Sequence, residues 1–163
     1  MLPGEQRRSG TVAVVSRIGI MLGVALPLAA ADLFVKASEP TEAWAYHERS
    51  FGWLLLSLSL LAGMVVIARI PSLLVAPAAG VLAGGLLGNS LSAAWNEMKV
   101  PNPLVFAGDR DLIAFNLADL WALAGIFLLV LAIGIWLIRN RALIPPPAEV
   151  GARRGRAFGR LFD

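Results

Sequence analysis

Four long apolar runs separated by polar segments constrain this chain more than any other feature. They cover residues 11–34, 53–70, 72–91 and 115–138. Each is close to the ~20 residues that a helix needs to cross the hydrocarbon core of a bilayer. Charged residues make up only 15% of the chain, whereas soluble domains carry about 25%. The sequence therefore predicts an all-α polytopic membrane protein, with four transmembrane helices and two longer loops within residues 1–142.

The two ends of the chain carry further signals. Ala29-Ala30-Ala31 resembles the small-residue cleavage site of a signal peptide, so a cleavable leader is the competing interpretation of the first run. We favour a retained span, because Asp32 and Lys36 make better sense kept than removed. At the other end, residues 143–163 are rich in arginine. We expect them to form a disordered cytoplasmic tail close to anionic lipid headgroups.

The distribution of basic residues predicts the orientation of the spans. Of the 14 Lys and Arg residues, most lie at the chain ends and beside the short connection between the second and third runs. They are Arg7, Arg8, Arg17, Arg69, Arg139, Arg141, Arg153, Arg154, Arg156 and Arg160. The two longer loops and their borders hold the rest, Lys36, Arg49, Lys99 and Arg110. The positive-inside rule therefore predicts cytoplasmic termini and two outer-face loops.

Composition also excludes several classes of function. The chain contains no cysteine, which excludes disulfides, thiolate metal sites and a cysteine nucleophile. His47 is the only histidine, and we interpret it as an interfacial loop residue rather than a metal ligand. The net charge of +3 comes from residues that flank apolar spans, so we expect no nucleic-acid partner. We expect no metal and no cofactor.

The third apolar run is rich in glycine and alanine. Gly80 and Gly84 are four residues apart and would lie on one face of a helix. Small residues at this spacing let a second membrane helix approach closely. The sequence therefore predicts a tight helix contact at these glycines.

Five polar residues lie at the outer ends of the first, third and fourth runs. They are Asp32, Lys36, Asn89, Asn116 and Asp119. Taken singly, each is explained as an ordinary interfacial or helix-capping residue. A carboxylate at the mouth of a membrane span is costly to place, however, and is a functional candidate by default. Their joint placement at one membrane face favours a site cut into a helix bundle.

Three motifs carry a resemblance to signal peptidase II, the prolipoprotein signal peptidase of bacterial inner membranes. Asp32-Leu33-Phe34-Val35-Lys36 is similar to the family's Asp-Gln-x-x-Lys motif, and Gly88-Asn89 to the start of its Gly-Asn-x-x-Asp-Arg motif. Phe115-Asn116-Leu117-Ala118-Asp119 matches Phe-Asn-x-Ala-Asp completely. The resemblance covers span number, topology and nearly the whole length. It implies a four-span aspartic endopeptidase in a bacterial inner membrane, with its site facing the periplasm or cell exterior.

The chain departs from the family pattern in three places. Ser92-Ala93 stands where the family has Asp-Arg, and Pro101 or Asn102 stands where it has its first catalytic aspartate. The family's conserved segment of the first outer loop has no counterpart between Trp44 and Trp53. Aspartic peptide hydrolysis needs two carboxylates close enough to share one proton. The departures therefore leave catalytic activity open.

The resemblance implies a role for each candidate residue. Asp119 would be one member of the catalytic pair, and Asp109 or Asp111, from the same outer loop, would be a displaced second member. A solvated turn is the simpler interpretation of Asp109-Arg110-Asp111. The remaining residues would order the binding pocket; they are Asp32, Lys36, Asn89 and Asn116.

Three functions fit these observations. The first is a divergent peptidase that removes signal peptides from lipid-modified preproteins. The second is a catalytically inactive paralogue that binds lipoproteins or lipid through the same groove. The third is a structural subunit of a membrane complex. The expected partners are membrane lipid and, for the first two functions, lipid-modified preproteins.

Overall fold

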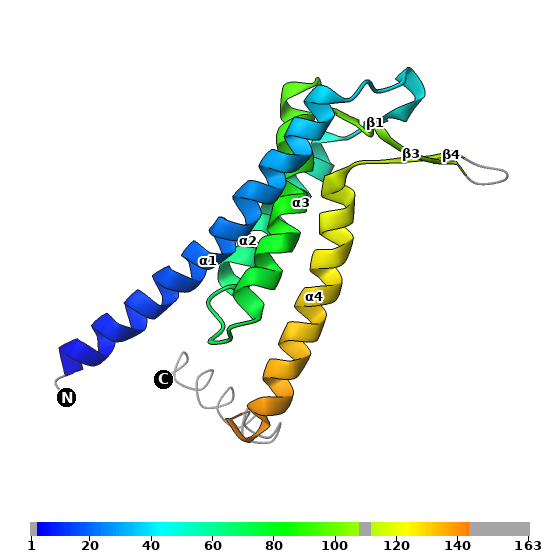
Figure 1. Ribbon diagram of the computed structural model, residues 1–163. Coiled ribbons are helices and arrows are strands. Elements are labelled where there is room, and N and C mark those ends of the chain that lie inside the picture. Colours follow the sequence, from blue (N-terminus) through cyan, green and yellow to red (C-terminus); the bar gives the residue numbers. More distant parts are fainter. Residues whose placement is uncertain (1–2, 108–111, 144–163) are drawn as a thin grey trace, which may run out of the picture. The chain divides into compact units, whose positions relative to one another are not determined.

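In the computed structural model, residues 3–107 and 112–143 are described, and they are mainly helical (Figure 1). The four α-helices are α1 (Pro3–Ser38), α2 (Phe51–Ile67), α3 (Val75–Trp95) and α4 (Leu117–Arg139). Between and after them lie four short strands and two 3₁₀ turns. These are η1 (Ala43–Ala45), β1 (Tyr46–Glu48), β2 (Lys99–Pro101), β3 (Leu104–Ala107), β4 (Leu112–Phe115) and η2 (Arg141–Leu143).

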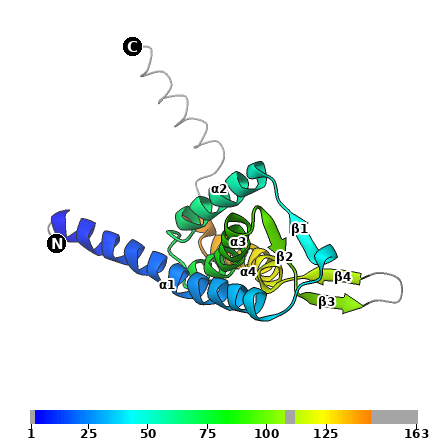
Figure 2. The same ribbon diagram turned by 90° about the horizontal axis from the view of Figure 1, so that it is seen from above.

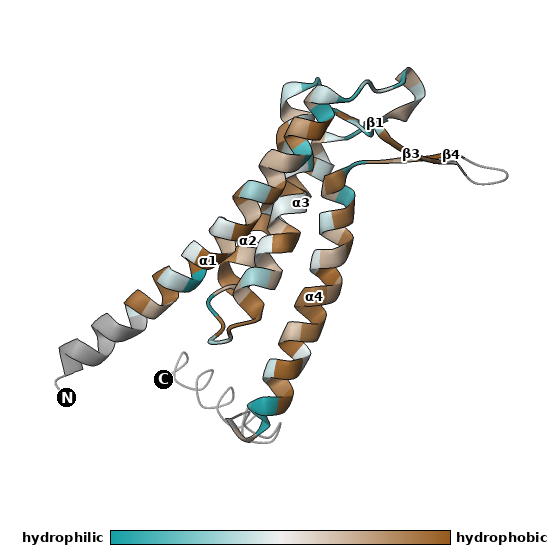
Figure 3. Cartoon of the chain, viewed as in Figure 1, coloured by the Kyte–Doolittle hydropathy of each residue, from teal (hydrophilic) through white to brown (hydrophobic). Residues whose placement is uncertain are grey.

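Three of the helices are long and apolar enough to cross a membrane. They span Thr11–Ser38, Val75–Trp95 and Leu117–Arg139, and the helices are mainly brown in the hydropathy colouring of Figure 3. Large apolar side chains along them face outward; Phe127 and Val130, for example, are 69% and 68% exposed. Soluble proteins rarely expose so much contiguous apolar surface. The chain is a membrane protein.

The second predicted span corresponds to α2, which has 17 residues. At ~1.5 Å per residue it is about 26 Å long, a little short of the ~30 Å hydrocarbon core. Four spans with both termini in the cytoplasm therefore remain a prediction.

Helix α3 forms the centre of the bundle. Of the most apolar 18 residues of α3, 67% are buried, against 22% for α1 and 17% for α4. α3 also packs against both α1 and α2 (Figure 2). A Cβ atom on Gly80 would lie 2.6 Å from the carbonyl oxygen of Met21, and one on Gly84 would lie 2.8 Å from Cβ of Leu28. The predicted close helix contact at these glycines is confirmed, and its partner is α1.

The two longer loops are joined by short strands, which the all-α prediction did not include. β1 pairs with β2 in antiparallel register, with Tyr46 opposite Pro101, and so ties the first loop to the second. β3 pairs with β4 in the same way, with Leu104 opposite Phe115. The chain between β2 and β3 is therefore held close to the start of α4.

The contacts divide the chain into two units, Met1–Ala132 and Ile133–Asp163. All residues of the site described below belong to the first unit. The predicted cytoplasmic tail, residues 143–163, lies almost entirely outside the described residues and stays a prediction.

Candidate functional site

The start of α4 is capped by two side chains of the Phe115–Asp119 motif. The Asp119 backbone N–H donates to Oδ1 of Asn116 at 3.0 Å, and the Asn116 backbone N–H donates to Oδ2 of Asp119 at 3.2 Å. This is the reciprocal arrangement of a capping box, which satisfies backbone donors that a helix start leaves open. Local capping thus explains why these two residue types are three positions apart, but not what else they contact.

Asn89 connects the α4 start to α1. Its Nδ2 donates to Oδ1 of Asp119 at 2.9 Å, and its Oδ1 accepts from Nζ of Lys36 at 2.8 Å. Asn89 lies near the C-terminal end of α3 and is 6% exposed. One buried amide therefore joins three helices and holds both of its neighbours by charge-assisted hydrogen bonds.

Lys36 and Asp32 form a buried ion pair within α1. Lys36 Nζ lies 2.6 Å from Oδ2 of Asp32, and their side chains are 4% and 0% exposed. The second oxygen, Oδ1, accepts from the backbone N–H of Ala118 at 2.8 Å. Asp32 thus caps α4 from another helix, and its negative charge suits the positive end of the α4 dipole.

Glycines in α3 make room for this arrangement. A Cβ atom on Gly88 would lie 2.6 Å from Oδ2 of Asp32. One on Gly85 would lie 2.5 Å from the carbonyl oxygen of Ala118 and 2.6 Å from the backbone nitrogen of Ala122. In the Gly88-Asn89 motif, the glycine thus leaves room for the Asp32 side chain, and the asparagine supplies the amide that hydrogen-bonds to Lys36 and Asp119.

Asn102 extends the network into the outer loops. Its Oδ1 accepts from Nδ2 of Asn116 at 2.6 Å, and its Nδ2 lies 3.0 Å from Nδ1 of His47 and donates to the Ala114 carbonyl at 3.3 Å. Asn102 is 0% exposed. The family resemblance aligned either Pro101 or Asn102 with the missing aspartate. Of these two residues, Asn102 is the one whose side chain contacts the Asn116 side chain.

Sequence reasoning missed the contact between His47 and Asn102. The two residues are 55 positions apart, and strand pairing between β1 and β2 brings them together. Neither composition nor helical spacing reports strand register. The hint in the sequence was that Asn102 is a polar residue between two prolines.

The five polar residues predicted at the span ends lie in one hydrogen-bonded network. The two remaining candidates, Asp109 and Asp111, lie outside the described residues. Within the part of the chain that the structure describes, no group of three or more His, Cys, Asp or Glu side chains is placed to hold a metal ion.

The two carboxylates of the network differ in what they can do chemically. Asp32 is sealed from solvent, and both of its oxygens accept charge-assisted or capping hydrogen bonds. Asp119 is only partly buried, and its hydrogen-bond partners are neutral N–H groups of Asn89 and Asn116. Asp119 therefore keeps some contact with solvent, whereas Asp32 has none. General acid–base chemistry at this site would therefore fall to Asp119.

Fold and site together define the class: a helical membrane protein with a polar network at one end of its bundle. Its backbone is similar to a solved structure described as a bacterial membrane enzyme, determined by the in meso method at 2.3 Å resolution. The TM-score is 0.54 at 16% sequence identity, and the match covers 78% of this chain and 92% of that one. At this identity the likeness is one of fold. No protein-family profile and no curated protein matches the sequence.

Proposed function

We propose that this chain is a divergent member of the signal peptidase II family, with Asp119 at the centre of a site for lipid-modified preproteins in a bacterial inner membrane. One observation carries the proposal: the only partly exposed carboxylate of the network is the last residue of Phe115–Asp119 and is held by Asn89 and Asn116. The fold of a bacterial membrane enzyme agrees with it.

In the enzymatic form of the proposal, Asp119 shares a proton with a second carboxylate, Asp109 or Asp111. The ionised member takes a proton from the attacking water, and the protonated member polarises the scissile carbonyl and then protonates the leaving nitrogen. The hydrogen bonds that Asp119 accepts from Asn89 and Asn116 hold its carboxylate in place at the start of α4.

A second candidate function, binding without cleavage, is favoured by Asn102. An amide stands where the resemblance sets a carboxylate, and both of its polar atoms are engaged by neighbouring groups. An amide cannot take a proton from water at neutral pH. With no second carboxylate, the site would hold a signal peptide or lipid chain but not hydrolyse it.

Cleavage of a lipid-modified preprotein by the purified full chain in detergent separates the two functions. The enzymatic form predicts that Asp119→Asn abolishes cleavage, with a loss of at least ~10²-fold, and that either Asp109→Asn or Asp111→Asn does the same. Glu97→Gln, an exposed carboxylate outside the network, is the matched control.

The outcome without cleavage is equally informative. If the wild type binds the preprotein without cutting it, and Asp119→Asn weakens the binding, the chain is an inactive binder. If the wild type neither binds nor cuts it, the family proposal is wrong and a structural subunit is the remaining interpretation.

A further inference from the structure

A second polar position lies at the opposite end of α1 from the candidate site. Arg17 precedes Lys36 by 19 residues, which is about 28 Å along a helix and close to the ~30 Å of a bilayer's hydrocarbon core. When Lys36 lies at one membrane surface, Arg17 therefore lies near the other, at the depth of the lipid phosphates.

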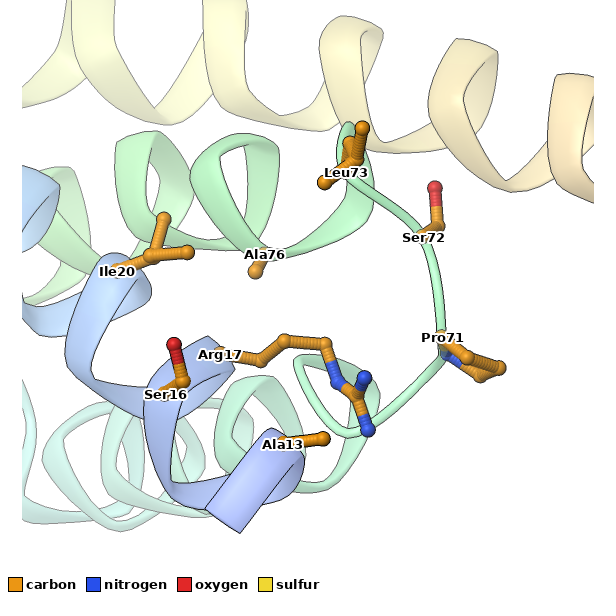
Figure 4. A pocket seen from close by; sticks show the side chains of 8 residues that line it. All are labelled: Ala13, Ser16, Arg17, Ile20, Pro71, Ser72, Leu73 and Ala76. Carbon is orange, nitrogen blue, oxygen red and sulfur yellow. The ribbon is translucent and has the colours of Figure 1, made fainter. Parts of the chain in front are cut away.

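Arg17 lies in a surface pocket between α1 and the connection from α2 to α3. The pocket has a volume of ≈ 380 Å³, and Figure 4 shows the Arg17 side chain reaching from α1 toward Pro71. It is lined by Ala13, Ser16, Arg17, Ile20, Pro71, Ser72, Leu73 and Ala76. The lining combines one guanidinium and two hydroxyl groups with apolar side chains.

One donor of the Arg17 guanidinium has no hydrogen-bond partner within the described chain. Its Nε is buried and makes no hydrogen bond there, and the ion pair found among the described residues, Lys36–Asp32, does not involve it. A buried donor without a hydrogen-bond partner is costly. A bound anion would remove this cost, and arginine suits phosphate because its planar fork donates two parallel hydrogen bonds.

The surroundings add further donors and an apolar wall. Ser72 Oγ accepts from the Leu74 backbone N–H at 3.3 Å, which leaves the hydroxyl hydrogen of Ser72 to donate. The start of α3, whose cap residue Leu74 supplies no side-chain acceptor, adds the positive end of a helix dipole. Ile20 and Leu73 are 45% and 92% exposed and would contact acyl chains.

We infer that this pocket binds a phosphate group through Arg17, either the phosphodiester of an anionic lipid or free phosphate. The inference holds whether or not the chain cleaves preproteins, because none of its residues belongs to the Asp119 network. Under the proposed orientation the pocket faces the cytoplasmic leaflet, where basic pockets between helices bind anionic headgroups.

The test measures lipid binding by the purified full chain. Phosphatidylglycerol and phosphatidylcholine are titrated separately into the detergent-solubilised protein, and bound lipid is counted by native mass spectrometry. Loss of a charge-assisted contact costs about tenfold or more in affinity. We expect Arg17→Gln to lose this factor for phosphatidylglycerol and to weaken phosphatidylcholine binding less, because the choline cation offsets the charge of the same phosphodiester.

Two further variants keep the test decisive. Ala13 is exposed and lines the pocket, so Ala13→Phe should obstruct it and weaken phosphatidylglycerol binding with Arg17 intact. Arg69 is exposed and lies near the same connection without lining the pocket, so Arg69→Gln is the control and should bind as the wild type does. If Arg17→Gln fails to fold, Ala13→Phe alone decides.

A parallel titration with inorganic phosphate distinguishes the two sources. The site would be assigned to free phosphate by two results together. Inorganic phosphate would bind in a way that depends on Arg17, and the protein would show no preference for phosphatidylglycerol over phosphatidylcholine. Equal binding of phosphatidylglycerol by wild type and Ala13→Phe, or no binding of either probe by the wild type, would overturn the inference.

Discussion

Nδ2 of Asn116 lies 2.6 Å from Oδ1 of Asn102, and this hydrogen bond joins the outer loops to the capped start of α4. Asn102 has no solvent exposure, so its amide is a fixed part of the network. The oxygen that accepts from Asn116 would be retained in an aspartate, whereas the nitrogen that faces His47 would be replaced by a second oxygen.

If the wild type binds a preprotein without cleaving it, this geometry makes Asn102→Asp a gain-of-function prediction. The substitution adds a carboxylate that can accept from Asn116, the residue that also caps α4 with Asp119. We expect cleavage of a lipid-modified preprotein to rise by at least ~10²-fold, the usual contribution of an acid or base. Asn102→Ser, which cannot ionise at neutral pH, is the control and should not gain cleavage; equal activity of the two variants would contradict a pairing of residue 102 with Asp119.

Lys36→Met should destabilise the protein strongly, because it leaves the Asp32 carboxylate buried with no cation. Breaking one side of a buried ion pair costs about 3–5 kcal/mol. Replacing both residues, as Asp32→Leu with Lys36→Met, should cost less than Lys36→Met alone. Thermal unfolding in detergent measures both variants beside the wild type, with exposed Lys99→Met as the control. A double variant less stable than Lys36→Met would show that the pair itself is not the important contact.

Gly85→Ala should destabilise the bundle although alanine is the better helix former by ~1 kcal/mol. Its Cβ would meet the backbone of Ala118 and Ala122 at 2.5 and 2.6 Å, where neither atom can turn away. Overpacking of this kind costs about 1–3 kcal/mol. Gly63 is the matched control, because a Cβ there has nothing within 4 Å. The melting temperature should fall for Gly85→Ala and stay level or rise for Gly63→Ala; equal shifts would argue against the tight contact.

The four-span orientation is testable because the chain has no cysteine. Single cysteines at exposed Glu42, before α2, and exposed Arg69, after it, should react with a membrane-impermeant maleimide from opposite sides. The positive-inside rule predicts Glu42 outside and Arg69 in the cytoplasm. Labelling of both positions from the same side would show that α2 does not cross the bilayer.

The parts of the structure that could be predicted from the sequence are those set by helical spacing. Asp32 and Lys36 are four residues apart, and Gly80 and Gly84 share a helix face for the same reason, so both contacts follow from local geometry. Asn89 and Asp119, which form a hydrogen bond, are 30 positions apart in the sequence. The sequence predicted only that these two residues lie at the same membrane face, not that they form this hydrogen bond.

Other contacts that escaped prediction depend on strands. β1 has three residues, too few for alternation to be recognised, and the register of β1 with β2 decides that His47 meets Asn102. A one-residue slip would turn His47 to the other face. Asn102 was therefore interpreted only as a missing carboxylate, although its amide bridges two other side chains.

The hydrogen bond from the Ala118 backbone to Asp32 joins residues that are 86 positions apart. During synthesis, Asp32 is therefore added to the chain long before Ala118, whose backbone N–H donates to its carboxylate. Lys36, one turn away on the same helix, follows Asp32 by four residues, so the cation that pairs with this carboxylate is made well before α4. The polar network is thus completed only when the last helix arrives, so that chains truncated before α4 lack a finished site even though most of its residues are already in place.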